Sequence, residues 1–181
     1  ALDHRVMNAL QEQPALMQST RGCYVTYVPL QKAEGADLHG SFPTTIVLKL
    51  RPTSLLADFP LSGFIRHEFM HLTDILDPCF AYEPELPKSE IGPTHDNLIR
   101  ERFRVLWDAW IDGRLLGRGW TTEEVVHNRL LEFQATFPML GENSEAIFST
   151  WSDSQLHTHN DLLRFARDPE SATPDRPAAP S

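Results

Sequence analysis

The sequence predicts an α+β fold in which helix is the larger part. Two short segments, residues 23–30 and 44–50, are rich in β-branched and aromatic residues, which is typical of strands. Apolar residues recur at helical spacing before these segments and over most of the chain after them. The expected order is therefore a helix, a small mixed or antiparallel sheet, and then a helical C-terminal half.

The N-terminal part is expected to hold one interrupted helix and two strands. Residues 3–18 carry apolar side chains in a helical rhythm that Pro14 interrupts. The segment CYVTYVPL (23–30) predicts a strand closed by Pro29, and TTIVLKL (44–50) predicts a second strand. The stretch between them, QKAEGADLHGSFP, contains two glycines and a proline and predicts a loop.

Helices are expected from residue 62 onward. Ser62 is a candidate N-cap for a helix that runs through Leu76 and that Pro78 stops. Residues 78–97 contain several prolines and predict a long irregular loop. Four further helices are then expected at residues 97–119, 123–137, about 143–151 and about 154–167.

Length and charge narrow the classes of function. The 181 residues predict one domain, residues 1–167, and a disordered tail, residues 168–181, rich in Pro, Ala and Ser. Sixteen Lys and Arg against 25 Asp and Glu give a net charge of −9, which argues against nucleic acid or an anionic membrane as the partner. We find neither a membrane-spanning apolar run nor a signal peptide, and we expect a cytoplasmic protein of undetermined oligomeric state.

The two cysteines are expected to be free. Cys23 and Cys79 do not have the Cys-x-x-Cys spacing of a cysteine zinc site. A disulfide between them is the alternative, which spacing alone does not decide. We expect two buried thiols in a reducing compartment.

Residues 66–77, RHEFMHLTDILD, carry the pattern on which the functional prediction rests. Residues four apart lie on the same face of a helix, so His67 and His71 can bind one metal ion together. Glu68 lies about 100° round the helix from His67, where a general base for a metal-bound water is needed. Apolar residues are expected to bury the other faces of this helix: Phe64, Ile65, Phe69, Leu72, Ile75 and Leu76.

With this HExxH motif and this order of elements, residues 23–135 resemble the zincin metallopeptidases, in a compact form similar to the minigluzincins. The resemblance implies an HExxH helix packed under a small sheet. It implies one catalytic Zn²⁺ held by His67 and His71, with Glu68 as the general base in the hydrolysis of a peptide or an unfolded protein. The segment 44–50 resembles the edge strand along which zincins bind an extended substrate.

The third zinc ligand is predicted to come from the helix at 97–119. Helical positions place Glu101, Asp108 and Asp112 in one stripe, and a buried carboxylate stripe needs a cation or hydrogen-bond donors. The stripe is flanked by apolar residues: Leu98, Val105, Ile111, Leu115 and Leu116. By resemblance to gluzincins and aspzincins, Asp108 is the ligand and Asp112 accepts a hydrogen bond from a ligand histidine. Glu101 is the alternate from the same stripe.

Two other positions remain open for the third ligand. A metzincin-like pattern returns a His or Asp six residues after the second histidine, which is Asp77 here, although Asp74 stands where that pattern has glycine. Asp74 lies on the same helical face as the two histidines, so it either orients a ligand or pairs with an arginine of residues 100–104. His95, in the preceding loop, is a further candidate ligand.

Other residues and other functions are considered alongside this prediction. Tyr24, Tyr27 and Tyr82 are candidate donors to an oxyanion, whereas His127, His157 and His159 have no partner at ligand spacing. One alternative function is a catalytically silent, metal-stabilised binding or regulatory domain with the zincin fold. Glu68 argues against it, because a structural metal site needs no general base. Hydrolysis of a non-peptide amide is the other alternative.

Overall fold

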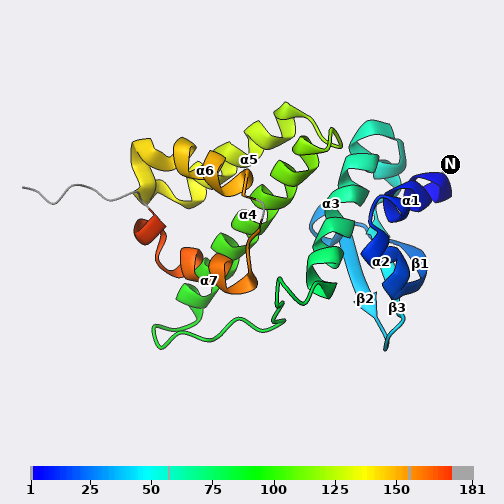
Figure 1. Ribbon diagram of the computed structural model, residues 1–181, viewed down its shortest axis with the longest axis horizontal. Coiled ribbons are helices and arrows are strands. Elements are labelled where there is room, and N and C mark those ends of the chain that lie inside the picture. Colours follow the sequence, from blue (N-terminus) through cyan, green and yellow to red (C-terminus); the bar gives the residue numbers. More distant parts are fainter. Residues whose placement is uncertain (1, 57, 155, 173–181) are drawn as a thin grey trace, which may run out of the picture. The chain divides into compact units, whose positions relative to one another are not determined.

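The computed structural model describes residues 2–56, 58–154 and 156–172, and it has the predicted helix-rich α+β composition with a small mixed sheet (Figure 1). The chain divides into two compact units, residues 1–78 and residues 79–181. The description of residues 1–167 as one functional domain stays a prediction.

The first unit contains a three-stranded sheet and the helices that cover one of its faces (Figure 1). The strand order is β1-β3-β2, with β1 parallel and β2 antiparallel to β3. In chain order the described elements are α1 (Leu2–Gln11), α2 (Pro14–Ser19), β1 (Thr20–Tyr27), η1 (Gln31–Ala33), β2 (Gly35–His39), β3 (Thr44–Leu50), η2 (Pro52–Leu56) and α3 (Asp58–Leu76).

The strand predicted at 44–50 is confirmed with the same bounds, and β1 begins three residues earlier than predicted. The loop predicted between them was wrong, because residues 35–39 form β2. This strand pairs with β3 from Gly35–Lys49 to His39–Thr45, and long-range pairing of this kind overrides a local glycine signal. Ser62 is not an N-cap, because α3 already begins at Asp58.

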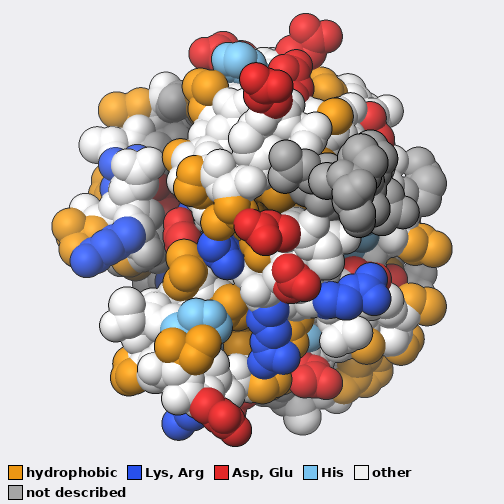
Figure 2. Space-filling view, turned by 90° about the vertical axis from the view of Figure 1, so that its left-hand side faces the viewer, with side chains coloured by type: hydrophobic (Ala, Val, Ile, Leu, Met, Phe, Trp, Pro, Cys, Tyr) orange, Lys and Arg blue, Asp and Glu red, His pale blue; other side chains and the backbone are white. Residues whose placement is uncertain are grey.

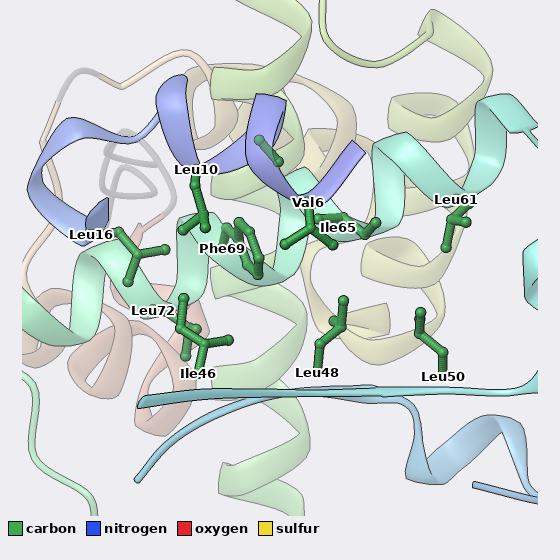
Figure 3. Close-up of a cluster of buried hydrophobic side chains, with 11 residues drawn as sticks. Val6, Leu10, Leu16, Ile46, Leu48, Leu50, Leu61, Ile65, Phe69 and Leu72 are labelled. Carbon is green, nitrogen blue, oxygen red and sulfur yellow. The ribbon is translucent and has the colours of Figure 1, made fainter. Parts of the chain in front are cut away.

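The core of the first unit lies between the sheet and its helices. Figure 3 shows β3 projecting apolar side chains toward α3 while α1 and α2 pack on the other side of that helix. The cluster consists of Val6, Ala9, Leu10, Leu16, Ile46, Leu48, Leu50, Leu61, Ile65, Phe69 and Leu72. Phe69 is fully buried in it. His67 and His71 each lie two residues, or about 200°, from Phe69 and therefore point away from this core.

Cys23 and Cys79 are both thiols, and the predicted absence of a disulfide between them is confirmed. Cys23 is half-buried, and burial raises the pKa of its thiol to about 11, so very little of it is the reactive thiolate at neutral pH. Cys79 is exposed, so the prediction of a buried thiol there was wrong. The preceding α3 has already ended at Leu76, which leaves this position in the connecting segment.

The second unit is helical and is organised around α4, which contacts α5, α6 and α7. Its described elements are α4 (Pro93–Gly117), α5 (Glu123–Thr136), η3 (Pro138–Asn143), α6 (Ser144–Ser152), α7 (His159–Arg167) and η4 (Pro169–Ala172). The helices agree with the prediction apart from their bounds, since α4 begins four residues earlier and α7 five residues later than expected. Within the expected tail, η4 forms a short turn, and residues 173–181 lie outside the described residues.

Aromatic side chains pack between the helices of the second unit and help to fix how these helices lie against one another. Two indole N–H groups donate across helices: Trp110 to the Ser154 carbonyl at 3.0 Å and Trp151 to the Leu106 carbonyl at 3.0 Å. Both bonds join α4 to α6 or to the chain directly after it. Because a buried indole N–H without a partner is costly, these bonds specify how α6 lies against α4.

Gly113 permits the close approach of α6 to α4, so Gly113→Ala is expected to lower the free energy of unfolding by about 1–3 kcal/mol. A Cβ at this position would lie 2.3 Å from the Ser152 carbonyl oxygen, which belongs to the backbone of α6. Urea denaturation at pH 7 measures the loss. Gly117→Ala is the matched control, because a Cβ there meets nothing within 4 Å. Equal stability of the two variants would contradict the prediction.

The surface has mixed charge where Figure 2 shows it. On this face Lys and Arg side chains form separate groups with Asp and Glu side chains between them, in a chain whose net charge is −9. Among the described residues, no helix has both the length and the apolar character that a membrane span requires.

Candidate active site

The two histidines of the motif lie side by side on α3. Their Nε2 atoms are 3.2 Å apart, and their ring planes are inclined by 70°. Two ligand nitrogens that share a tetrahedral zinc ion, each about 2.05 Å from it, are about 3.3 Å apart. The donor pair formed by His67 and His71 therefore fits one zinc ion without rearrangement of the helix.

Glu68 extends from the same turn toward the sheet. Its Oε2 atom accepts a hydrogen bond of 2.9 Å from the main-chain N–H of Ala36, the second residue of β2. An N–H that bonds to a side chain of α3 is not part of the ladder with β3, so the Ala36 main chain faces the outer edge of the sheet. The carboxylate of the predicted general base thus lies at the outer edge of β2.

The edge strand differs from the one that the sequence predicted. Segment 44–50 is β3, which pairs with β1 on one side and β2 on the other, so its prediction as the edge strand was wrong. Within this sheet β1 and β2 are the outer strands, and β2 is the one that contacts α3 beside Glu68. The alternating apolar pattern of 44–50 is also that of a central strand, which composition alone does not distinguish from an edge strand.

The chain entering β2 is held by a buried carboxylate. Glu34 accepts hydrogen bonds from the Arg51 main-chain N–H at 2.8 Å, the Arg51 Nε at 2.8 Å and the Ser54 hydroxyl at 2.6 Å. Only 8% of the Glu34 side chain is exposed, so these donors replace its hydration. Burial alone raises the pKa of Glu34, but the hydrogen bonds and the charge of Arg51 outweigh it and hold the pKa below its usual value.

The Glu34→Gln variant is expected to be less stable than wild type at pH 7 by about 2 kcal/mol, because it loses charge-assisted hydrogen bonds. The folded pKa lies below the unfolded value of 4.5, so the carboxylate contributes its full stability above pH 4.5 and loses it as the pH falls through the folded pKa. The difference between the two proteins should therefore shrink in acid. Urea denaturation from pH 7 to pH 3 measures it, and a constant difference would contradict the prediction.

Asp74 and Asp77 occupy different environments near the end of α3. Asp74 is buried, whereas Asp77 is exposed. The Asp77 main-chain N–H donates to the Thr73 carbonyl at 3.0 Å, so the helical hydrogen bonds of α3 extend to this N–H and the chain has not yet turned back toward the histidines. At 1.5 Å per residue, Asp77 lies about 9 Å along the helix axis from His71. This geometry does not favour the metzincin-like assignment of the third ligand.

The predicted carboxylate stripe on α4 is buried at two of its three positions. Asp108 is 6% exposed and Asp112 is 2% exposed, while Glu101 is exposed. Arg104 donates to Asp108 Oδ2 at 2.7 Å, and Arg129 Nε donates to Asp112 Oδ2 at 2.7 Å. Arg129 also approaches Asp108 Oδ2 at 3.5 Å. The sequence predicted that these carboxylates need positive charge beside them. It did not predict that two arginines of the same unit supply part of that charge.

The remaining candidates have structural surroundings of their own. Tyr24 and Tyr27 are exposed on β1, and burial raises the pKa of Tyr82, whose ring contacts Trp107 and His159. His157 stacks on Trp151 with ring centroids 3.8 Å apart, and His95 hydrogen-bonds the Ser89 hydroxyl at 3.0 Å. His127 is exposed on α5. The interpretation of His127, His157 and His159 as ordinary side chains stays a prediction.

Comparisons of the chain with protein-family models, with curated proteins and with solved structures found no match. The residues of the chain itself therefore carry the functional inference. The first compact unit by itself contains the histidine pair, the neighbouring Glu68 and the edge of β2 that Glu68 contacts.

Proposed function

We propose that this chain is a zinc-dependent peptidase. The observation that carries the proposal is the geometry of α3, where the His67 and His71 Nε2 atoms are 3.2 Å apart and a glutamate follows the first of them. Two imidazole nitrogens at this separation are the donors that zinc prefers, and they match its tetrahedral coordination. A purely structural zinc site does not require the carboxylate of Glu68 beside the two histidines.

Glu68 serves as the general base in this proposal. Bound zinc lowers the pKa of a coordinated water and polarises a carbonyl oxygen. Glu68 takes a proton from the attacking water and later gives it to the amine of the departing peptide. The same carboxylate therefore accepts the proton and donates it. His67 and His71, whose Nε2 atoms are 3.2 Å apart, would hold the zinc ion beside it. The products are a new carboxyl terminus and a new amino terminus.

The outer edge of β2 is proposed as the substrate-binding edge in place of 44–50. The main chains of Ala36 and, by strand alternation, Leu38 face outward, while the intervening residue faces β3. An extended peptide can pair with such an edge through main-chain hydrogen bonds. This mode of binding tolerates many sequences, which suits a peptide or an unfolded protein as the substrate.

Asp108 remains the proposed third ligand, on the strength of the sequence pattern. Within the second unit Asp108 is a buried carboxylate of α4, as that pattern predicted, and its Oδ2 atom accepts a hydrogen bond from Arg104. Asp112 keeps its proposed role as the carboxylate that orients a ligand histidine. Zinc titration of Asp108→Asn and Asp77→Asn separates the alternatives, since only loss of the true ligand weakens binding strongly.

Wild type and Glu68→Gln, both loaded with zinc, test the proposed function. The substrates are a reduced and alkylated unfolded protein and a mixed peptide library, and metal content is measured on the same samples. We expect wild type to hydrolyse peptide bonds and Glu68→Gln to be slower by about 10²–10⁴-fold while it retains zinc. Glu124→Gln is the matched control, because it makes the same change at an exposed residue of α5.

Equal hydrolysis by wild type and Glu68→Gln would overturn the role of Glu68. Zinc binding by wild type without hydrolysis of any member of the library would favour the silent, metal-stabilised binding domain. Failure of wild type to bind zinc would overturn both functions, because each of them requires the histidine pair.

A further inference from the structure

The hydrogen bond between Ala36 and Glu68 joins residues 32 positions apart in the chain. The donor is a main-chain N–H of β2 and the acceptor is Oε2 of the carboxylate, at 2.9 Å. A strand edge next to a helix does not require such a bond, because an outward N–H can be hydrated instead. The contact therefore selects one orientation of the Glu68 side chain among the rotamers that a partly buried glutamate can adopt.

The backbone on the N-terminal side of Ala36 has a conformation that favours glycine. Gly35 has a φ of +155°, a conformation that residues with a Cβ rarely adopt. A Cβ at this position would lie 3.4 Å from Glu68 Oε2, at the short limit of ordinary contact. Glycine at position 35 thus permits the chain path that leads to the Ala36 N–H.

The donor itself is fixed from two directions. On one side β2 pairs with β3 along Gly35–His39. On the other side, Glu34 precedes the strand directly and is bound by Arg51, which directly follows β3, and by Ser54 in η2. Because the strand is held at both places, the Ala36 N–H is a preorganised donor. Its position does not change with the rotamer of the Glu68 side chain.

We infer that the main-chain N–H of Ala36 is a positioning group that holds Glu68 in its working orientation, so that Oε2 is the anchored oxygen and Oε1 the one that exchanges protons. The consequence for turnover rests on the proposed peptidase function. Ala36 acts through Glu68 and does not itself contact the reacting atoms. Its N–H is already occupied, so an extended peptide on this edge pairs with the Ala36 carbonyl and with Leu38 instead.

Proline substitution at two outward positions of β2 tests the inference. Ala36→Pro removes the N–H that holds Glu68, and Leu38→Pro removes the next outward N–H, which is assigned to substrate. Proline is tolerated on an edge strand where the N–H faces away from its neighbour. We expect Ala36→Pro to lower kcat by about 10²-fold with KM little changed, as for a small displacement of a catalytic group. Leu38→Pro is expected to raise KM with kcat little changed.

A measurement without turnover examines the same bond in the zinc-free protein. The amide proton of Ala36 is expected to move upfield in Glu68→Gln relative to wild type, because it loses a charged acceptor. The amide proton of Leu38 should not move. This comparison remains decisive if Ala36→Pro fails to fold, and it is independent of any substrate.

An unmoved Ala36 amide proton, or equal kcat values for the two proline variants, would overturn the inference. Failure of the proposed function has a different signature, since wild type would then bind zinc without hydrolysis while the amide shift is still present. Gly35→Ala provides a second variant, because the φ of +155° at this position strains any residue with a Cβ and so disturbs the chain directly before Ala36 without removal of its N–H. Its kcat should fall in the same direction as that of Ala36→Pro.

Discussion

His71→Ala is expected to weaken zinc binding by about 10²–10³-fold. Four-ligand structural sites bind zinc with about 10–16 kcal/mol, which is about 2.5–4 kcal/mol for each ligand. His71 Nε2 lies 3.2 Å from its counterpart on His67, and alanine removes it without disturbing the apolar residues on the opposite face of α3. Competition titration with a chromophoric chelator measures the change in affinity.

His127→Ala is the control for this result, because it removes an exposed histidine of α5. It should bind zinc as wild type does. Thermodynamic linkage provides a second readout, since zinc at 100 times its Kd raises the free energy of unfolding of wild type by about 2.7 kcal/mol. The His71→Ala variant should gain far less at the same zinc concentration. Wild-type affinity in His71→Ala would rule out the histidine pair as the metal site.

Arg129→Ala is expected to lower the free energy of unfolding by about 3 kcal/mol. Arg129 Nε donates to Asp112 Oδ2 at 2.7 Å, and only 3% of the Asp112 side chain is exposed. Burial on its own lowers the pKa of Arg129, but the charges of Asp108 and Asp112 outweigh it and raise that pKa. Removal of the guanidinium leaves a buried carboxylate without this partner, which is among the costliest changes in a folded protein.

Urea denaturation at pH 7 measures this loss, and the matched control is Arg164→Ala. Arg164 is 73% exposed and pairs with Asp161 at 3.3 Å on the surface of α7, so its loss should cost less than about 1 kcal/mol. The double variant Arg129→Ala, Asp112→Asn should recover part of the stability, because the unpaired charge is then absent. Similar stabilities of the two arginine variants would show that Asp112 is satisfied without Arg129.

The helices that carry the candidate site were predictable because their signals are local. The spacing of His67 and His71 follows from helix geometry alone, and the structure confirms the helix through Leu76. The same reasoning placed Asp108 and Asp112 on a buried face of α4, which is also confirmed. In each case the period of the apolar residues decides which side chains share a face.

The strand that contacts Glu68 was not predictable in this way. Segment 35–39 contains only a short alternation in which the side chains of Ala36 and Leu38 face the core. The glycine next to it indicates a turn. Its pairing with β3 and its bond to Glu68 are contacts between distant parts of the chain. The composition of a short segment does not indicate which distant segment it will contact. The arginines beside the α4 carboxylates were missed for the same reason, since Arg129 comes from a different helix.

By itself the sequence determined the kind of chemistry available: two imidazoles four residues apart, a carboxylate between them, and the helix that presents all three. These follow from the 3.6-residue period, which any helix imposes on its own side chains. Only the tertiary structure decided that β3 is the central strand, that β2 is the edge beside the motif, and that the Ala36 N–H holds Glu68. Strand order and hydrogen bonds across the fold depend on which distant surfaces bury each other, and a linear pattern does not specify that choice.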